Sequence, residues 1–226
     1  MQTKLVRDKG AVGLVVPPRK RRVPPVAIDN ADDDDDVIIV TSRPAPSTAV
    51  PPHRYFYGRY PRPAHADPHC KVDPALFFLS NFASSIIIIG GKGYATVEHY
   101  YQSQKFMPAH PVLAERIRTA VNARAAKFIA GQAGAAMMRA DWRQVNIDVM
   151  RTALVAKFQQ NEPLRDKLLA TAPSALHEDA PGDMFWGSLG QDWLGKLLTE
   201  IRDQIIAQQI AEREADSIID LDYWQD

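Results

Sequence analysis

The chain has 226 residues, of which 46% are hydrophobic and 24% are charged, and these values exclude a wholly disordered protein. Lys and Arg together number 27, as do Asp and Glu, so the net charge gives no whole-chain argument for nucleic-acid binding. With a single cysteine, Cys70, no secretory signal and no apolar run of about 18 to 20 residues, the chain is expected to be intracellular, without a membrane span or an intrachain disulfide.

The N-terminal third differs in composition from the rest. Twelve of the 17 prolines lie at or before Pro74, together with a basic cluster at 19–22 and an acidic run at 32–36. Proline blocks regular structure and blocks of like charge repel, so residues 1–52 are predicted to be a disordered tail. The composition that follows predicts one domain at 53–212, and the last residues, 213–226, form a second acidic and hydrophobic tail.

The first elements expected in the domain are strands. Tyr55–Tyr57 is a short aromatic strand candidate. The β-branched run Ile86–Ile89, the glycine-rich turn at 90–93 and the following Tyr94 predict an antiparallel hairpin.

Helices are predicted for most of the remaining sequence. Thr96 is a good N-cap for a helix over Val97–Phe106, which Pro108 ends. Further helices are expected at 111–121, 123–130, 141–160, 163–170 and 194–212. The helix at 141–160 repeats apolar residues at steps of three and four, which predicts one buried stripe of Trp142, Val145, Val149, Ala153 and Ala156. The fold class is therefore α+β, a mostly helical single domain with a small antiparallel sheet.

One face of the helix at 97–106 carries groups that suit catalysis. Glu98, Gln102 and Lys105 fall at i, i+4 and i+7, so a carboxylate, an amide and an amine share that face. Such a face can bind a sugar and supply an acid or a base. From the spacing alone, a solvated face with a Glu–Lys pairing is the more frequent alternative.

Two other segments join an aromatic ring to charged groups. Asp183 and Trp186 share a loop in which the indole can stack on a nucleobase, the alternative being a tryptophan folded into the core. Trp142 follows Arg139, whose guanidinium fork matches phosphate geometry, and here the alternative is a core tryptophan with surface arginines. No metal site is predicted, because the His- and Cys-bearing stretch 65–70 lacks a second pair of ligands.

In chain order these blocks resemble the NADAR family, which is named for its link to NAD and ADP-ribose. The block from Glu98 to Gln102, Glu-His-Tyr-Tyr-Gln, is the most specific part of the resemblance. The similarity covers about two-thirds of the chain, from Tyr55 to Ile206. Its other blocks are Leu79–Phe82, Asp141-Trp142, Met150–Leu164, Asp183–Gly187 and Leu194–Arg202.

The resemblance implies a hydrolase that acts on N-glycosyl bonds and needs no cofactor. Members of the family cut a C–N bond at the anomeric carbon of a phosphorylated ribose. The favoured substrate is ADP-ribose attached to guanine in DNA. The alternatives are phosphoribosylated intermediates of the riboflavin pathway, or a non-catalytic ADP-ribose reader that recruits SUMO-modified partners.

The site residues expected from the resemblance and from the patterns above fall into two sets. Glu98, Asp183 and Lys105 are the catalytic candidates, the carboxylates as acid and base and the lysine as a Schiff-base nucleophile in a variant mechanism. The expected substrate-binding residues are Ser80, Asn81, Tyr94, Gln102, Arg139, Trp142, Trp186 and Asp192. The chain departs from the family pattern in its short segment 187–194, where Asp192 stands at a position that is usually asparagine.

The two tails carry candidate partner motifs. Val37–Val40, after the acidic run, and Ile218–Leu221, among acidic residues, resemble SUMO-interaction motifs, in which an extended peptide adds a strand to the partner's sheet. The alternatives are a stray strand for the first and a continuation of the last helix for the second. The basic cluster at 19–22 resembles a nuclear-import signal. The expected location is the nucleus or the cytoplasm, and a nuclear address favours the DNA substrate.

Overall fold

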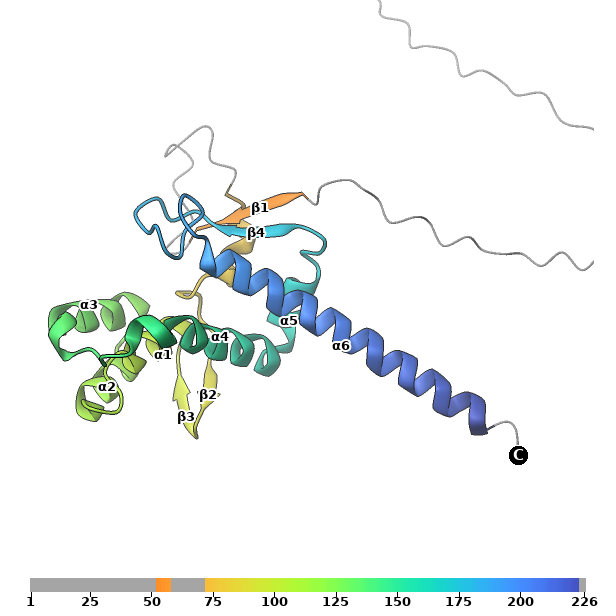
Figure 1. Ribbon diagram of the computed structural model, residues 1–226, viewed down its shortest axis with the longest axis horizontal. Coiled ribbons are helices and arrows are strands. Elements are labelled where there is room, and N and C mark those ends of the chain that lie inside the picture. The colour runs from red at the N-terminus through yellow and green to blue at the C-terminus, as the bar shows by residue number, and fades with distance from the viewer. Residues whose placement is uncertain (1–51, 58–71, 224–226) are drawn as a thin grey trace, which may run out of the picture. The chain divides into compact units, whose positions relative to one another are not determined.

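Helices make up most of the computed structural model, which describes residues 52–57 and 72–223 and side chains up to residue 216 (Figure 1). These residues belong to one compact unit, Thr48–Asp226. Almost all of the predicted tail at 1–52, including Val37–Val40 and the basic cluster, lies outside the described residues, as does the stretch 65–70.

The helices confirm the predicted fold class. They are the 3-10 helix η1 (Pro74–Leu79), α1 (Val97–Gln104), α2 (Pro111–Arg118), α3 (Ala123–Ala133), the 3-10 helix η2 (Ala135–Met137), α4 (Trp142–Gln160), α5 (Glu162–Leu169) and α6 (Trp193–Tyr223). As predicted, Thr96 caps α1, and its Oγ1 accepts a hydrogen bond from the His99 N–H at 3.3 Å. Gly134, at φ 76°, ends α3 in a conformation that favours glycine.

Two small sheets accompany the helices. β2 (Ile87–Ile89) and β3 (Lys92–Tyr94) form the predicted antiparallel hairpin, with Gly90 at φ 58° and Gly91 at φ 75° in the turn. β1 (His53–Phe56) pairs in parallel with β4 (Ala175–Glu178), which the sequence analysis did not predict. A parallel pair joins distant segments and carries no local turn signal, so the pattern of neighbouring residues does not reveal it.

Side-chain amides close the outer edge of the hairpin. The Ile88 N–H donates to Gln160 Oε1 at 2.7 Å, and the Ile88 carbonyl accepts from Gln160 Nε2 at 2.9 Å. Asn161 Nδ2 donates to the Ile86 carbonyl at 3.2 Å. The Gln160 amide therefore lies where the backbone of a third strand would pair.

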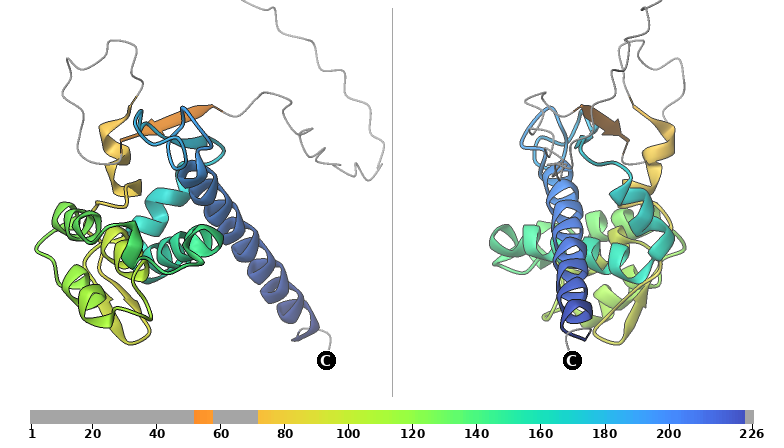
Figure 2. Two further views of the ribbon diagram at one scale, coloured as in Figure 1. Left: turned by 60° about the vertical axis from the view of Figure 1, so that its left-hand side comes forward. Right: turned by 90° about the vertical axis from the view of Figure 1, so that its right-hand side faces the viewer.

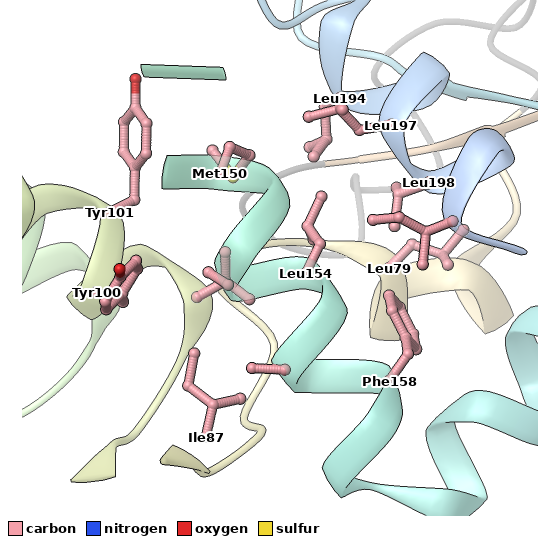
Figure 3. Close-up of a cluster of buried hydrophobic side chains, with 14 of the residues drawn as sticks. Leu79, Ile87, Tyr100, Tyr101, Met150, Leu154, Phe158, Leu194, Leu197 and Leu198 are labelled. Carbon is pink, nitrogen blue, oxygen red and sulfur yellow. The ribbon is translucent and has the colours of Figure 1, made fainter. Parts of the chain in front are cut away.

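The core lies around α4, which packs between α1 on one side and α6 on the other (Figure 3). Trp142, Ala153 and Ala156 of the predicted stripe are buried, whereas Val145 and Val149 are only half-buried. Met150, Leu154 and Phe158 of this helix are also fully buried. The predicted stripe is narrower than the buried face of the helix, because α4 is covered on two sides.

The last helix is longer than predicted. Expected over 194–212, α6 continues to Tyr223, and in Figures 1 and 2 its C-terminal part extends beyond the other helices. The side chains at 211–216 are exposed. Residues 218–221 are helical here, whereas strand addition needs an extended peptide. No helix within the described part of the chain is both long and apolar enough to cross a membrane.

Candidate active site

A cleft in two chambers lies beside α1. The inner chamber, of about 130 Å³, is lined by Asn81, Phe82, Glu98, Tyr101, Gln102, Lys105, Lys127, Met150, Glu178, Asp183 and Trp186. The outer chamber, of about 340 Å³, is lined by Tyr57, Phe82, Lys127, Glu178 and the loop 180–183. Both chambers are bounded by Phe82, Lys127, Glu178 and Asp183, so they form one continuous cleft.

α1 presents its predicted polar face to the inner chamber. Glu98 is only 4% exposed and Gln102 is also buried, so this face is not the solvated one that spacing alone allowed. Gln102 Nε2 donates to Glu98 Oε1 at 2.8 Å, which fixes the carboxylate in place. Because the Glu98 N–H donates to the Asn81 carbonyl at 3.1 Å, the start of α1 is also tied to the loop that carries Asn81.

Asn81, which lines the inner chamber, carries a buried acceptor. Its side chain is buried, and its Oδ1 atom has no hydrogen-bond partner among the described residues. An unsatisfied buried acceptor costs about 1–3 kcal/mol, so it marks a place where a ligand donor would be favourable. The loop is held from below by Lys157, whose Nζ donates to the Ser80 carbonyl at 2.9 Å and whose pKa burial lowers to about 7.

The amine of Lys105 lies beside two aromatic rings. Its Nζ is 5.2 Å from the centroid of the Tyr101 ring and 5.7 Å from that of the Trp142 ring. Burial lowers the pKa of Lys105, and the charge of Lys127 acts in the same direction, while Glu98 and Asp183 oppose it. The amine is therefore more readily deprotonated than an exposed lysine, as a nucleophile requires.

Asp183 and Trp186 share one tight loop, as the sequence analysis expected. Asp183 Oδ1 accepts from the N–H groups of Phe185 at 3.1 Å and Trp186 at 2.9 Å. A Cβ atom at Gly187 would lie 2.5 Å from the Ala180 carbonyl oxygen, so only glycine permits this turn. The Trp186 ring packs edge-on against Tyr101, 5.6 Å between centroids, and the indole becomes a wall of the inner chamber.

Glu178 is a third carboxyl group of the cleft, and the sequence analysis missed it. It ends β4, is 8% exposed, and lines both chambers. Burial, followed by the charges of Asp183, Glu98 and Asp192, raises its pKa to about 8, against a smaller opposing effect of Lys127. The sequence held one signal that could have indicated Glu178. It is an acidic residue at the end of a segment, 175–178, in which apolar and polar residues alternate, and it lies five residues before Asp183.

Five predicted binding residues do not line the cleft. Ser80 is buried beneath it, with its Oγ accepting from the Phe82 N–H at 3.0 Å. Trp142 lies one layer behind, its ring 5.0 Å from that of Tyr101. Tyr94 lines a separate cavity of about 260 Å³ between the hairpin, α1 and α2. Arg139 is engaged by its neighbour Asp141, to which its Nε and Nη2 donate at 2.6 and 2.8 Å.

Asp192 is the fifth predicted binding residue outside the cleft, and it contacts the strand that carries Glu178. It adopts φ 51°, and its Oδ2 lies 2.5 Å from His177 Nδ1. Its Oδ1 accepts from the Glu178 N–H at 3.3 Å. Its carboxylate thus holds the end of β4 rather than facing a chamber.

Among the residues that the structure describes, none form a cluster of three or more His, Cys, Asp or Glu side chains able to hold a metal ion.

Known proteins are similar to this chain in sequence and in fold. The family model described as NADAR domain matches residues 55–206. N-glycosidase YbiA of Escherichia coli (strain K12) is 39% identical over 137 residues, which cover 58% of this chain and 82% of that protein. Riboflavin biosynthesis protein VVA0006 of Vibrio vulnificus (strain YJ016) is 36% identical over 132 residues, covering 57% of this chain and 35% of that protein. The NMR structure of E. coli YbiA matches with a TM-score of 0.56 at 33% identity, covering 71% of this chain and 90% of that chain.

A sugar-sized chamber with three carboxyl groups, in a chain so similar to N-glycosidases, defines the class. The protein is a hydrolase that acts on N-glycosyl bonds. It belongs to the NADAR family.

Proposed function

We propose that this N-glycosidase removes ADP-ribose from guanine in DNA. The observation that carries the proposal is the convergence on one small chamber of Glu98, Asp183 and Asn81, whose amide oxygen has no hydrogen-bond partner among the described residues. The ribose occupies the inner chamber, where Asn81 Oδ1 accepts from a sugar hydroxyl. The base occupies the larger outer chamber, beside the rings of Tyr57 and Phe82.

Glu98 is assigned to the anomeric carbon. As the C–N bond breaks, its electron pair leaves with the nitrogen and positive charge develops on the ribose. A buried carboxylate stabilises that charge and can take the proton of the attacking water. The hydrogen bond from Gln102 keeps the Glu98 carboxylate oriented toward the chamber. Asp183 is fixed by two backbone N–H groups at the boundary between the chambers. Its carboxylate lies on the side of the bond from which the nitrogen departs.

Lys105 permits a covalent variant of the same reaction. An amino-linked ribose can open to an iminium at its anomeric carbon, and the lysine amine can add there. The base amine then departs with a proton, and water hydrolyses the resulting Schiff base to release the sugar and the free lysine. The lowered pKa of Lys105 supports this route.

A second substrate class is favoured by one specific finding. A matching protein of Vibrio vulnificus is named for riboflavin biosynthesis, which points to small phosphoribosylated amines. Such a substrate needs the same chamber for its ribose and the same chemistry at the C–N bond. The nuclear-import and SUMO-interaction motifs proposed for the tails favour the DNA substrate, since a small metabolite requires neither.

The test is a direct assay of product release. An oligonucleotide with ADP-ribose on guanine is incubated with the wild type, with Glu98→Gln and with Glu162→Gln, and free ADP-ribose is measured by mass spectrometry. Glu162 is an exposed glutamate of α5 and serves as the matched control. We expect release by the wild type and the control, and at least a hundredfold loss in Glu98→Gln.

The other outcomes separate the remaining candidates. Release only from a phosphoribosyl amine would replace the DNA substrate by the small one. Tight binding of ADP-ribose without turnover of either compound would contradict the proposal and favour a reader. Unchanged turnover in Glu98→Gln would contradict the assignment of Glu98.

A further inference from the structure

Glu178 occupies the boundary between the two chambers. It is one of four residues that line both, and the other carboxyl group among them is that of Asp183. If the sugar lies in the inner chamber and the base in the outer one, as the proposed function requires, the scissile bond crosses this boundary. A side chain that acts on the departing nitrogen must therefore lie at this boundary.

The backbone of Glu178 is held on several sides. Its N–H donates to Asp192 Oδ1 at 3.3 Å, and its carbonyl accepts from Ala180 at 3.0 Å and from Ser188 at 2.7 Å. In the parallel pair its register partner is Phe56, a fully buried residue of β1. Such a position fixes where the side chain can reach, which a loop residue with free backbone groups would not do.

The surroundings of Glu178 favour a neutral carboxyl group. Three acidic side chains act on it, those of Glu98, Asp183 and Asp192, and the cation of Lys127 opposes them. The group is buried, so water does little to stabilise its charge. A carboxyl group that stays protonated near neutral pH is what a general acid needs.

We infer that Glu178 is the general acid that protonates the departing nitrogen of the base. This inference rests on the proposed function. When the C–N bond breaks, the electron pair moves onto the nitrogen and the Glu178 carboxyl proton passes to it, leaving a carboxylate. Glu98 takes a proton from the attacking water, and proton exchange with solvent restores both groups. Glu98 and Glu178 thus act on opposite ends of the bond that breaks.

The test depends on the leaving group. A nitrophenolate departs without protonation, whereas an amine does not, so the variants are compared on two ADP-ribosides: the guanine adduct and the 4-nitrophenyl riboside of the same anomeric configuration. We expect Glu178→Gln to lower kcat at least a hundredfold on the guanine adduct and less than tenfold on the nitrophenyl riboside. Glu98→Gln lowers kcat on both, and Glu162→Gln on neither.

Binding and substrate controls keep the inference falsifiable. The Kd of ADP-ribose, measured by calorimetry, should differ less than threefold between Glu178→Gln and the wild type. An equal loss on both ribosides, or no loss on the guanine adduct, would overturn the role of Glu178. If the wild type cleaves a phosphoribosyl amine but not the guanine adduct, the substrate proposal fails alone, and the same comparison on that amine decides on Glu178. A wild type inactive on every riboside would overturn the proposed function itself.

Discussion

The substitution Glu178→Gln should stabilise the fold while it impairs catalysis. The pKa of this carboxyl rises from 4.5 to about 8 on folding, chiefly because of burial. Between these two values the folded chain binds more protons than the unfolded chain, so the wild type loses stability as the pH rises from 4.5 to 8. Glutamine mimics the protonated acid and cannot ionise in either state, so the variant does not share this loss.

The size of the effect follows from the shift. One pKa unit corresponds to about 1.4 kcal/mol, so the advantage of Glu178→Gln should grow from near zero at pH 4.5 to about 3 kcal/mol at pH 7 and about 4 kcal/mol at pH 8. For a chain of this length, about 3 kcal/mol corresponds to a rise in Tm of roughly 10 °C. The dependence on pH, more than the size at any one pH, identifies the buried carboxyl group.

Urea unfolding, followed by circular dichroism from pH 5 to pH 9, measures this difference directly. Glu162→Gln, at an exposed position of α5, should give a difference from the wild type that is flat over the range. Groups that titrate alike in both proteins cancel in the difference. A gap between Glu178→Gln and the wild type that stays constant between pH 5 and pH 8 would refute the buried, neutral carboxyl group.

Two further predictions concern other parts of the chain. If Lys105 forms a Schiff base, borohydride added during turnover should attach the sugar to the wild type and to Lys167→Met, an exposed control, but not to Lys105→Met; the absence of adduct in a turning-over wild type would leave only direct attack by water. If the motifs of both tails bind SUMO, replacing Ile38-Ile39 and Ile218-Ile219 by alanine should abolish a SUMO pull-down, and undiminished capture would rule both motifs out.

Local signals predicted much of the fold and one side of the cleft. The hairpin follows from a β-branched run and a glycine turn. The helical spacing of Glu98, Gln102 and Lys105 is enough to place them on one face of α1 and its C-cap. The opposite side was harder to predict. Glu178 enters the cleft only because β4 pairs with β1, and this pairing joins segments far apart in the chain.

Other residues of the cleft are set by tertiary packing alone. Lys127 lies in an alanine-rich helix with no motif around it, and it lines the cleft only because α3 packs against α1. Asp192 was expected to bind substrate from the family resemblance, yet its carboxylate is used by His177 and by the backbone of β4. A side chain of the right type therefore indicates a site only when the fold leaves it available.

The amide of Gln160 bears on how copies of this protein behave toward one another. An uncovered strand edge is a template for another chain. Ile88 of β2 and Ile86, which precedes the strand, are 60% and 68% exposed. The outward backbone groups of Ile88 are occupied by the side-chain amide of Gln160, which is not itself part of a strand, and the Ile86 carbonyl accepts from Asn161. Deamidation of Gln160 to glutamate would place a carboxylate next to the Ile88 carbonyl. The two acceptors repel each other, so the new side chain would leave the edge. The loss of this one amide would then leave the backbone N–H and carbonyl of Ile88 open, which is the kind of strand edge that another chain can pair with.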